Sequence, residues 1–232
     1  MDKIYFLRPG TDTHKIVLRK ILSIINNSKQ LLFCVSYFTH MGIADAIIER
    51  VKSKKETYMI LNTHDILRPQ GQKSTVINVS AALLKIFTNV GHAYEGEDGE
   101  YHYIGHSDEY DNPLKVKLVG RDSSLDSLQS IMHEKFIVGD RKIVAFGSLN
   151  YTHNAFKNNY ENVCFSKDII LVDTFRNEFS DLWKHGDTFF TEKGKIRSVL
   201  CPMCRKEGGI DFDSYGASCT YCSHKFRKTD YG

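Results

Sequence analysis

The stretch HEKFIVGDRKIVAFGSLN, residues 133–150, constrains the fold more than any other part of this 232-residue chain. Two apolar runs flank Gly139-Asp140, which is a strong signal for a β-hairpin. Because side chains alternate between the two faces of a strand, His133 and Lys135 share one face and Phe136 takes the other. A hairpin folded at Gly139-Asp140 brings residue 133 opposite roughly residue 147. The stretch therefore predicts two antiparallel strands with polar residues gathered at one end.

In such a hairpin, Ser148 and Asn150 arrive beside His133 and Lys135. Lys135 supplies positive charge, and the hydroxyl and amide supply neutral hydrogen-bond donors. His133 can act as a nucleophile or carry a proton near neutral pH. This combination suits a phosphate, and Gly147 allows the backbone to turn tightly there. The alternative is an unconnected set of exposed polar residues on an edge hairpin.

Asp140 lies at the other end of the hairpin. It is about seven residues from His133, or on the order of 20 Å if the strand is straight. We expect Asp140 to shape the turn and to take no part in the chemistry.

Short β-rich runs alternate with helical patterns along the chain, which predicts an α/β layered domain over residues 1–190. The predicted helices cover residues 11–27, 40–52, 81–90 and 169–183. The predicted strands cover residues 30–38, 57–63, 114–120, 132–139, 142–148 and 160–166. Residues 91–112 differ from the rest, because they hold seven acidic residues and no Lys or Arg. We expect this acidic insert to form a surface loop or hairpin.

Four cysteines close together near the end of the chain predict a second, small domain over residues 191–232. Two C-x2-C pairs, with fourteen residues between them, have the spacing of a zinc ribbon. We expect one structural Zn²⁺ per chain, with a small hairpin between the pairs; a redox-active dithiol pair is the alternative. The ligands would be Cys201, Cys204, Cys219 and Cys222. Basic residues around them could grip nucleic acid, or the module could dock a protein.

The pattern H-x-K-x4-D-x6-G-S-x-N resembles the HKD motif of the phospholipase D superfamily. It matches His133, Lys135, Asp140, Gly147, Ser148 and Asn150 without a gap. A glutamate that follows the motif in that family, and helps to orient the histidine, corresponds to Glu161. The resemblance implies a phospholipase D-like domain in which helices flank a central mixed β-sheet.

The resemblance also implies a two-step phosphodiester transfer that needs no catalytic metal. One histidine attacks phosphorus to give a phosphohistidine, and a second protonates the leaving oxygen; Lys135 and Asn150 would hold the phosphate oxygens. His133 is the only histidine in the chain that is followed two residues later by lysine. An active enzyme is therefore expected to be a homodimer that pairs His133 with its symmetry mate.

Single-motif chains resemble the small nucleases and certain restriction endonucleases more than the lipases. We therefore expect an endonuclease that acts on DNA or RNA. The alternatives are a phospholipid-hydrolysing enzyme and a partner-dependent subunit of a defence or restriction complex. The first residues lack an apolar signal region and no apolar run is long enough to cross a bilayer, so we expect a cytoplasmic protein without membrane attachment.

Overall fold

The computed structural model describes eleven ranges of the chain. They are residues 2–62, 67–70, 74–77, 80–90, 92–95, 101–104, 113–120, 131–185, 187–188, 210–213 and 216–219. The helices are α1 (Thr13–Asn27), α2 (Met41–Lys52), α4 (Ala81–Val90) and α5 (Ile169–His185). The strands of the main sheet are β1 (Lys3–Leu7), β2 (Gln30–Val35), β3 (Glu56–Asn62), β8 (Leu114–Val119), β9 (Lys135–Gly139), β10 (Ile143–Gly147), β11 (Glu161–Ser166) and β12 (Asp187–Thr188).

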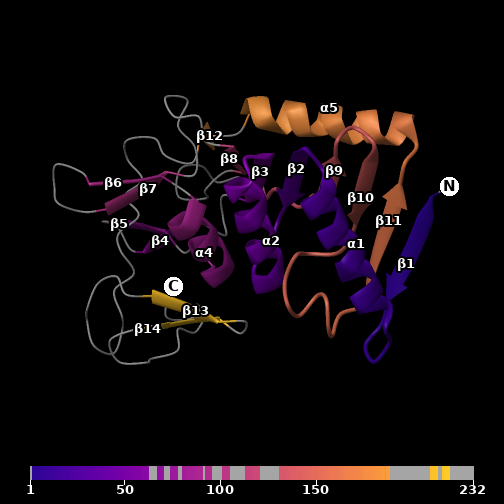
Figure 1. The fold of residues 1–232 in the computed structure, drawn as a ribbon, viewed down its shortest axis with the longest axis horizontal. Coiled ribbons are helices and arrows are strands. Elements are labelled where there is room, and N and C mark those ends of the chain that lie inside the picture. Colours follow the sequence, from indigo (N-terminus) through magenta and orange to yellow (C-terminus); the bar gives the residue numbers. More distant parts are fainter. Residues whose placement is uncertain are drawn as a thin grey trace.

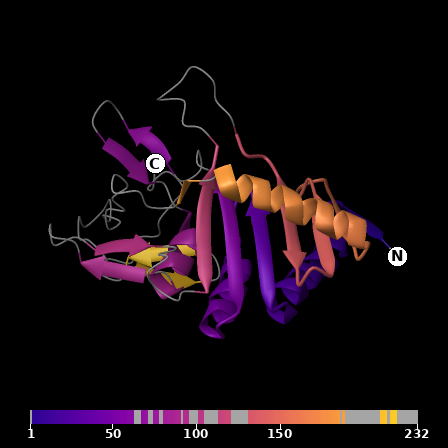
Figure 2. The ribbon, with the colours of Figure 1, turned by 90° about the horizontal axis from the view of Figure 1, so that it is seen from above.

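The main sheet is mixed, and its strand order is β1-β11-β10-β9-β2-β3-β8-β12. The pairs β2–β3 and β3–β8 are parallel, whereas the other pairs are antiparallel. Helix α5 crosses one face of the sheet, and α1 and α2 lie on the other (Figures 1 and 2). The α/β layered fold with a central mixed sheet that the sequence predicts is therefore confirmed.

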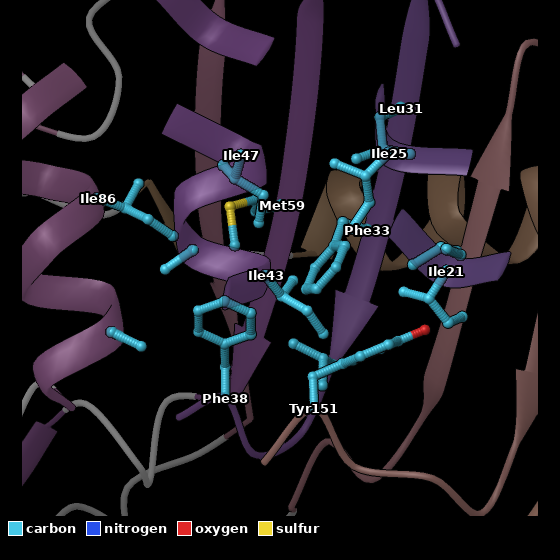
Figure 3. Close-up of a cluster of buried hydrophobic side chains, with 14 of the residues drawn as sticks. Ile21, Ile25, Leu31, Phe33, Phe38, Ile43, Ile47, Met59, Ile86 and Tyr151 are labelled. Carbon is cyan, nitrogen blue, oxygen red and sulfur yellow. The ribbon is translucent and has the colours of Figure 1, made fainter. Parts of the chain in front are cut away.

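Side chains of alternate parity build two apolar layers. On the side of α1 and α2, Phe33, Ile47 and Met59 belong to one buried cluster, shown in Figure 3. On the side of α5, Phe136 and Phe179 belong to a second cluster. Lys135 shares its parity with Ile137, which faces α1 and α2, so the predicted separation of Lys135 from Phe136 is confirmed.

The β9–β10 hairpin is present, but its turn lies one residue later than predicted. Asp140 and Arg141 are the central residues, with φ values of 52° and 55°, and the amide of Lys142 donates to the carbonyl of Gly139 at 2.9 Å. Two left-handed central residues define a type I′ turn, whose twist matches that of the strands. Gly139 consequently pairs with Ile143, and the predicted placement of residue 133 opposite residue 147 is wrong by two positions.

Strand β1 was missed by the sequence analysis. It pairs with β11 at the edge of the sheet, and Ile4 and Phe6 are 60% and 64% exposed. A run whose outward residues are as apolar as its inward ones lacks the alternation that marks a half-buried strand. The strand was therefore not recognisable by its pattern.

In the described parts of the chain, three small hairpins lie outside the main sheet. β6 (His92–Glu95) pairs with β7 (Tyr101–Ile104). Of the loop or hairpin predicted for the acidic insert, the structure therefore contains a hairpin. β13 (Ile210–Asp213) pairs with β14 (Gly216–Cys219), as predicted between the two cysteine pairs. β4 (Leu67–Gln70) and β5 (Ser74–Ile77) form a hairpin that was not predicted.

Candidate active site

The predicted catalytic and phosphate-binding residues gather at one end of the central strands, whereas Asp140 lies elsewhere. Lys135 begins β9, Gly147 ends β10 and Glu161 begins β11. These three strands are neighbours in the sheet, with Gly147 paired to Val163. Antiparallel pairing thus places two strand starts beside one strand end, and the side chains there come from segments far apart in the sequence.

Lys135 is the buried cation of the site. The residue is only 7% exposed, and its Nζ donates a hydrogen bond of 2.6 Å to the carbonyl of His133. Burial lowers the pKa of Lys135 below its ordinary value, and the nearby Glu161 carboxylate opposes that shift. The ammonium group is therefore held in place beside the histidine, where it can contact a phosphate oxygen.

Ser148 and Glu161 are joined directly. The hydroxyl of Ser148 donates to Oε2 of Glu161 and accepts a hydrogen bond of 3.0 Å from the amide of Asn162. The other carboxylate oxygen, Oε1, accepts from Nδ2 of Asn159 at 3.1 Å. Sequence reasoning missed Asn159; its place two residues before Glu161 gives no independent signal. The hydrogen bonds described for Glu161 thus lead to Ser148 and Asn159, and those described for His133 do not include Glu161.

Gly147 allows the close approach that this arrangement needs. Its φ is +156°, and a Cβ atom at this position would lie 2.2 Å from the backbone oxygen of Asn162. That same oxygen accepts a hydrogen bond of 3.1 Å from the amide of Ser148. A side chain at position 147 would push β11 away and separate Ser148 from Glu161.

His133 and Asn150 complete the set. His133 is exposed and lies two residues before the start of β9, so its imidazole is open to a substrate or to another subunit. The Oδ1 atom of Asn150 is buried without a hydrogen-bond partner. Such an atom calls for an explanation in a folded protein, and a bound ligand that carries a hydrogen-bond donor is one.

Asp140 lies at the far end of β9. Its Oδ1 accepts hydrogen bonds from the amides of Lys29 and Gln30, at 2.7 and 2.9 Å. Its own amide donates to the carbonyl of Gln30 at 3.1 Å. These contacts tie the hairpin turn to the start of β2, and they keep the Asp140 carboxylate away from the residues at the other end of the strand.

The described residues contain no group of three or more His, Cys, Asp and Glu side chains placed to hold a metal ion. The predicted zinc ligands fall outside this statement: Cys201, Cys204 and Cys222 lie outside the described residues, and only the backbone of Cys219 is described. Outside that region, Cys34 is buried, which raises the pKa of its thiol, whereas Cys164 is only half-buried. Within the described ranges, no helix has the length and apolar character required to cross a bilayer.

Curated relatives of this chain are mitochondrial cardiolipin hydrolases. The protein of Homo sapiens is 37% identical over 83 residues, which cover 34% of this chain and 33% of the relative. The protein of Canis lupus familiaris is 41% identical over 98 residues, which cover 40% of this chain and 36% of the relative. This chain therefore spans about a third of the length of the curated relatives that it matches.

Solved structures share the fold. NucT from Helicobacter pylori superposes with a TM-score of 0.58 at 19% identity, covering 82% of this chain and 99% of that one. Nuc from Salmonella typhimurium, described as a phospholipase D family member, gives 0.53 at 16% identity and covers 82% of this chain and all of that one. The family model described as "Cardiolipin synthase, PLD-like domain" matches residues 21–183. The match covers all of α2, most of α5 and every motif residue, and the chain belongs to this phospholipase D-like domain family.

Proposed function

We propose that the chain is a metal-independent phosphodiesterase that cleaves DNA or RNA. The observation that supports the proposal is that Lys135 and Glu161 begin neighbouring strands at one end of the sheet, with the buried Lys135 hydrogen-bonded to the carbonyl of an exposed His133. A buried cation next to an open imidazole suits attack on a phosphodiester, because the cation neutralises the charge that develops on the phosphate oxygens.

In the proposed mechanism, His133 attacks phosphorus and forms a phosphohistidine. The P–O bond to the leaving group breaks, and the leaving oxygen takes a proton from a second imidazole. Water then attacks phosphorus, the P–N bond to His133 breaks, and the second product leaves, while that imidazole takes the water proton. Lys135 and Asn150 hold the phosphate oxygens in both steps.

The second imidazole is proposed to come from another copy of the chain. Attack and departure occur on opposite sides of phosphorus, and this chain has one His-x-Lys triplet. A two-fold axis near the exposed His133 would bring the partner subunit's His133 to the opposite side of the phosphate. Each of the paired chains would then contribute the same residues to a single site.

Cardiolipin hydrolysis is the second candidate function. The curated relatives that support it are 37% to 41% identical in the aligned segments, and their names state that they act on cardiolipin. Both substrates contain phosphodiesters, so the same two-step chemistry would serve either. The single motif and the basic C-terminal region favour nucleic acid.

A substrate panel distinguishes the two candidates. We expect the purified protein to cleave at least one of single- or double-stranded DNA or RNA after brief exposure to excess EDTA, at the rate seen without chelator. Cardiolipin vesicles should be hydrolysed more slowly than the preferred nucleic acid. Faster hydrolysis of cardiolipin would select the second function, and cleavage of neither substrate by folded dimer would point to a partner-dependent subunit of a defence or restriction complex.

We propose further that Cys201, Cys204, Cys219 and Cys222 bind one structural Zn²⁺. In support, β13 and β14 form an antiparallel hairpin that ends at Cys219, with Ile210 paired to Cys219. We expect metal analysis of protein purified under reducing conditions to find about one zinc per chain. Substitution of Cys219 by serine should lower that value and destabilise this region first. Folded protein without zinc, in which these four cysteines are free thiols, would contradict the proposal.

A further inference from the structure

Buried polar atoms without partners gather near the candidate active site. Within the described residues, five buried side-chain nitrogen or oxygen atoms have no hydrogen-bond partner. Four of them belong to Ser36, Asn62 and Asn150, and the fifth is Nε of Arg176 in α5. Both polar atoms of the Asn62 amide are unpaired, although the residue is only 1% exposed.

The strand register places Ser36 and Asn62 side by side at the site end of the sheet. Val35 pairs with Leu61 on one side and with Lys135 on the other. Ser36 is the residue after Val35, and Asn62 is the residue after Leu61. Adjacent strands lie about 4.8 Å apart, so the end of β3 is about 10 Å from the start of β9.

The unpaired amide is costly to the fold. A buried donor or acceptor without a partner destabilises a protein, whereas an apolar residue of the same shape would not. Leucine has nearly the shape of asparagine and would suit a position that follows Ile60 and Leu61, both of which are buried. An asparagine at position 62 is therefore not explained by packing.

We propose that Ser36 and Asn62 form a subsite that binds a nucleobase next to the scissile phosphate. This inference rests on the nuclease function proposed above. An amide that can donate and accept at once is complementary to a base edge, as when asparagine pairs with adenine. A nucleoside can span the distance from the phosphate at Lys135 to β3. Ser36 adds a hydroxyl that can donate or accept beside it.

The geometry also sets the path of the substrate. Lys135 lies on the α1 and α2 side of the sheet, whereas Asn62 shares the α5 side with Ile60. A substrate held by both residues runs across the end of the sheet. Because the polar atoms of Ser36 and Asn62 are enclosed, neighbouring side chains must move aside when the base enters.

The test compares two kinds of substrate in four proteins. Wild type, Asn62→Leu and the control Thr57→Val are assayed on oligonucleotides that vary the base beside the cleaved bond, and on bis(p-nitrophenyl) phosphate, which has no base. Thr57 is a suitable control because it is also buried in β3, but its hydroxyl is paired with Arg50 and Lys55. Thermal unfolding is measured for each protein, and Ser36→Ala serves as a second, smaller change.

We expect Asn62→Leu to lower kcat/KM on the preferred oligonucleotide by about 10- to 100-fold and to weaken its base preference. Activity on bis(p-nitrophenyl) phosphate should stay near that of wild type, and the melting temperature should not fall. Thr57→Val should lower the melting temperature and keep the base preference. Ser36→Ala should act in the same direction as Asn62→Leu, with a smaller loss.

Equal losses of kcat/KM on both substrates would overturn the inference, because the Asn62 amide would then have a structural role only. No loss on either substrate would also overturn it, because the amide would then have no role in activity. If Asn62→Leu does not fold, the same readings apply to Ser36→Ala. A wild-type protein that hydrolyses bis(p-nitrophenyl) phosphate or cardiolipin but no oligonucleotide would overturn the proposed function, and the base subsite with it. If wild type cleaves oligonucleotides, and the variants keep the wild-type ratio of kcat/KM on the oligonucleotide to kcat/KM on bis(p-nitrophenyl) phosphate, the subsite alone is overturned.

Discussion

Substitution of His133 by alanine is expected to lower the rate of phosphodiester cleavage by roughly 10⁴-fold or more. The change removes the nucleophile and, in a site shared by two subunits, the acid as well. Because His133 is exposed and precedes β9, its loss should leave the folded structure intact. Single-turnover cleavage of the preferred substrate measures the effect, and thermal unfolding checks the fold.

Asp140→Asn is the matched control within the same motif. Asp140 accepts two backbone hydrogen bonds at the far end of β9, so its substitution should lower the melting temperature and leave kcat near the wild-type value. An equal catalytic loss in a well-folded Asp140→Asn protein would show that the turn takes part in the chemistry. Retained turnover in the protein without His133 would show that another group is the nucleophile.

The same His133→Ala protein tests whether two subunits share one site. When wild-type and variant chains are unfolded together and refolded in equal amounts, about a quarter of the dimers contain two wild-type chains. A shared site predicts activity that falls as the square of the wild-type fraction. Activity that falls linearly, to about half in this mixture, would show that each chain works alone.

Substitution of Arg50 by methionine is expected to lower the free energy of unfolding by about 3–5 kcal/mol. Arg50 is 2% exposed, and its guanidinium group donates five hydrogen bonds of 2.6–2.9 Å. The acceptors are the carbonyls of Ile25, Ser28, Lys29 and Glu56 and the hydroxyl of Thr57. Methionine fills the space but leaves these groups without a donor, and urea unfolding measures the loss.

Two further variants make this result interpretable. Arg176→Met also replaces a helical arginine, but Arg176 is partly exposed and pairs with Asp173 at the surface, so less than about 1 kcal/mol should be lost. Arg50→Lys keeps the charge and can satisfy at most three acceptors, so its loss should be intermediate. A change within about 1 kcal/mol for Arg50→Met would mean that water replaces the guanidinium group.

The sequence predicted those parts of the fold that depend on local pattern. The helix over residues 81–90 has the predicted bounds, and α5 extends the predicted helix by two residues. Apolar periodicity reports a buried face directly, which explains this agreement. The turn at Asp140 and Arg141 was misplaced, because it uses two residues with positive φ of which neither is glycine, and Gly139 looked like the better turn residue.

The sequence predicted which residues form the candidate site, but not which contacts they make. Spacing identified the residues from His133 to Asn150, but the contacts of Glu161 depend on how residues 151–160 return to the sheet. The roles of Arg50 and Asn62 arise from strands and helices meeting at long range. The sequence pattern shows only an arginine in an amphipathic helix and an asparagine at a strand end. It does not indicate that the arginine is buried with five hydrogen bonds, or that the asparagine amide is buried without a partner.

The pairing of β1 with β11 has a consequence for synthesis of the chain on the ribosome. Lys3 pairs with Phe165, so the first strand made can find its neighbour only after nearly all of this domain has been translated. At 5–20 residues per second, that delay is on the order of 10–30 s. During this time Tyr5 and Leu7, which later face the helices, have no sheet to cover them. The β1–β11 pairing is therefore a late step of folding, and the exposed apolar residues of β1 can bind chaperones until it occurs.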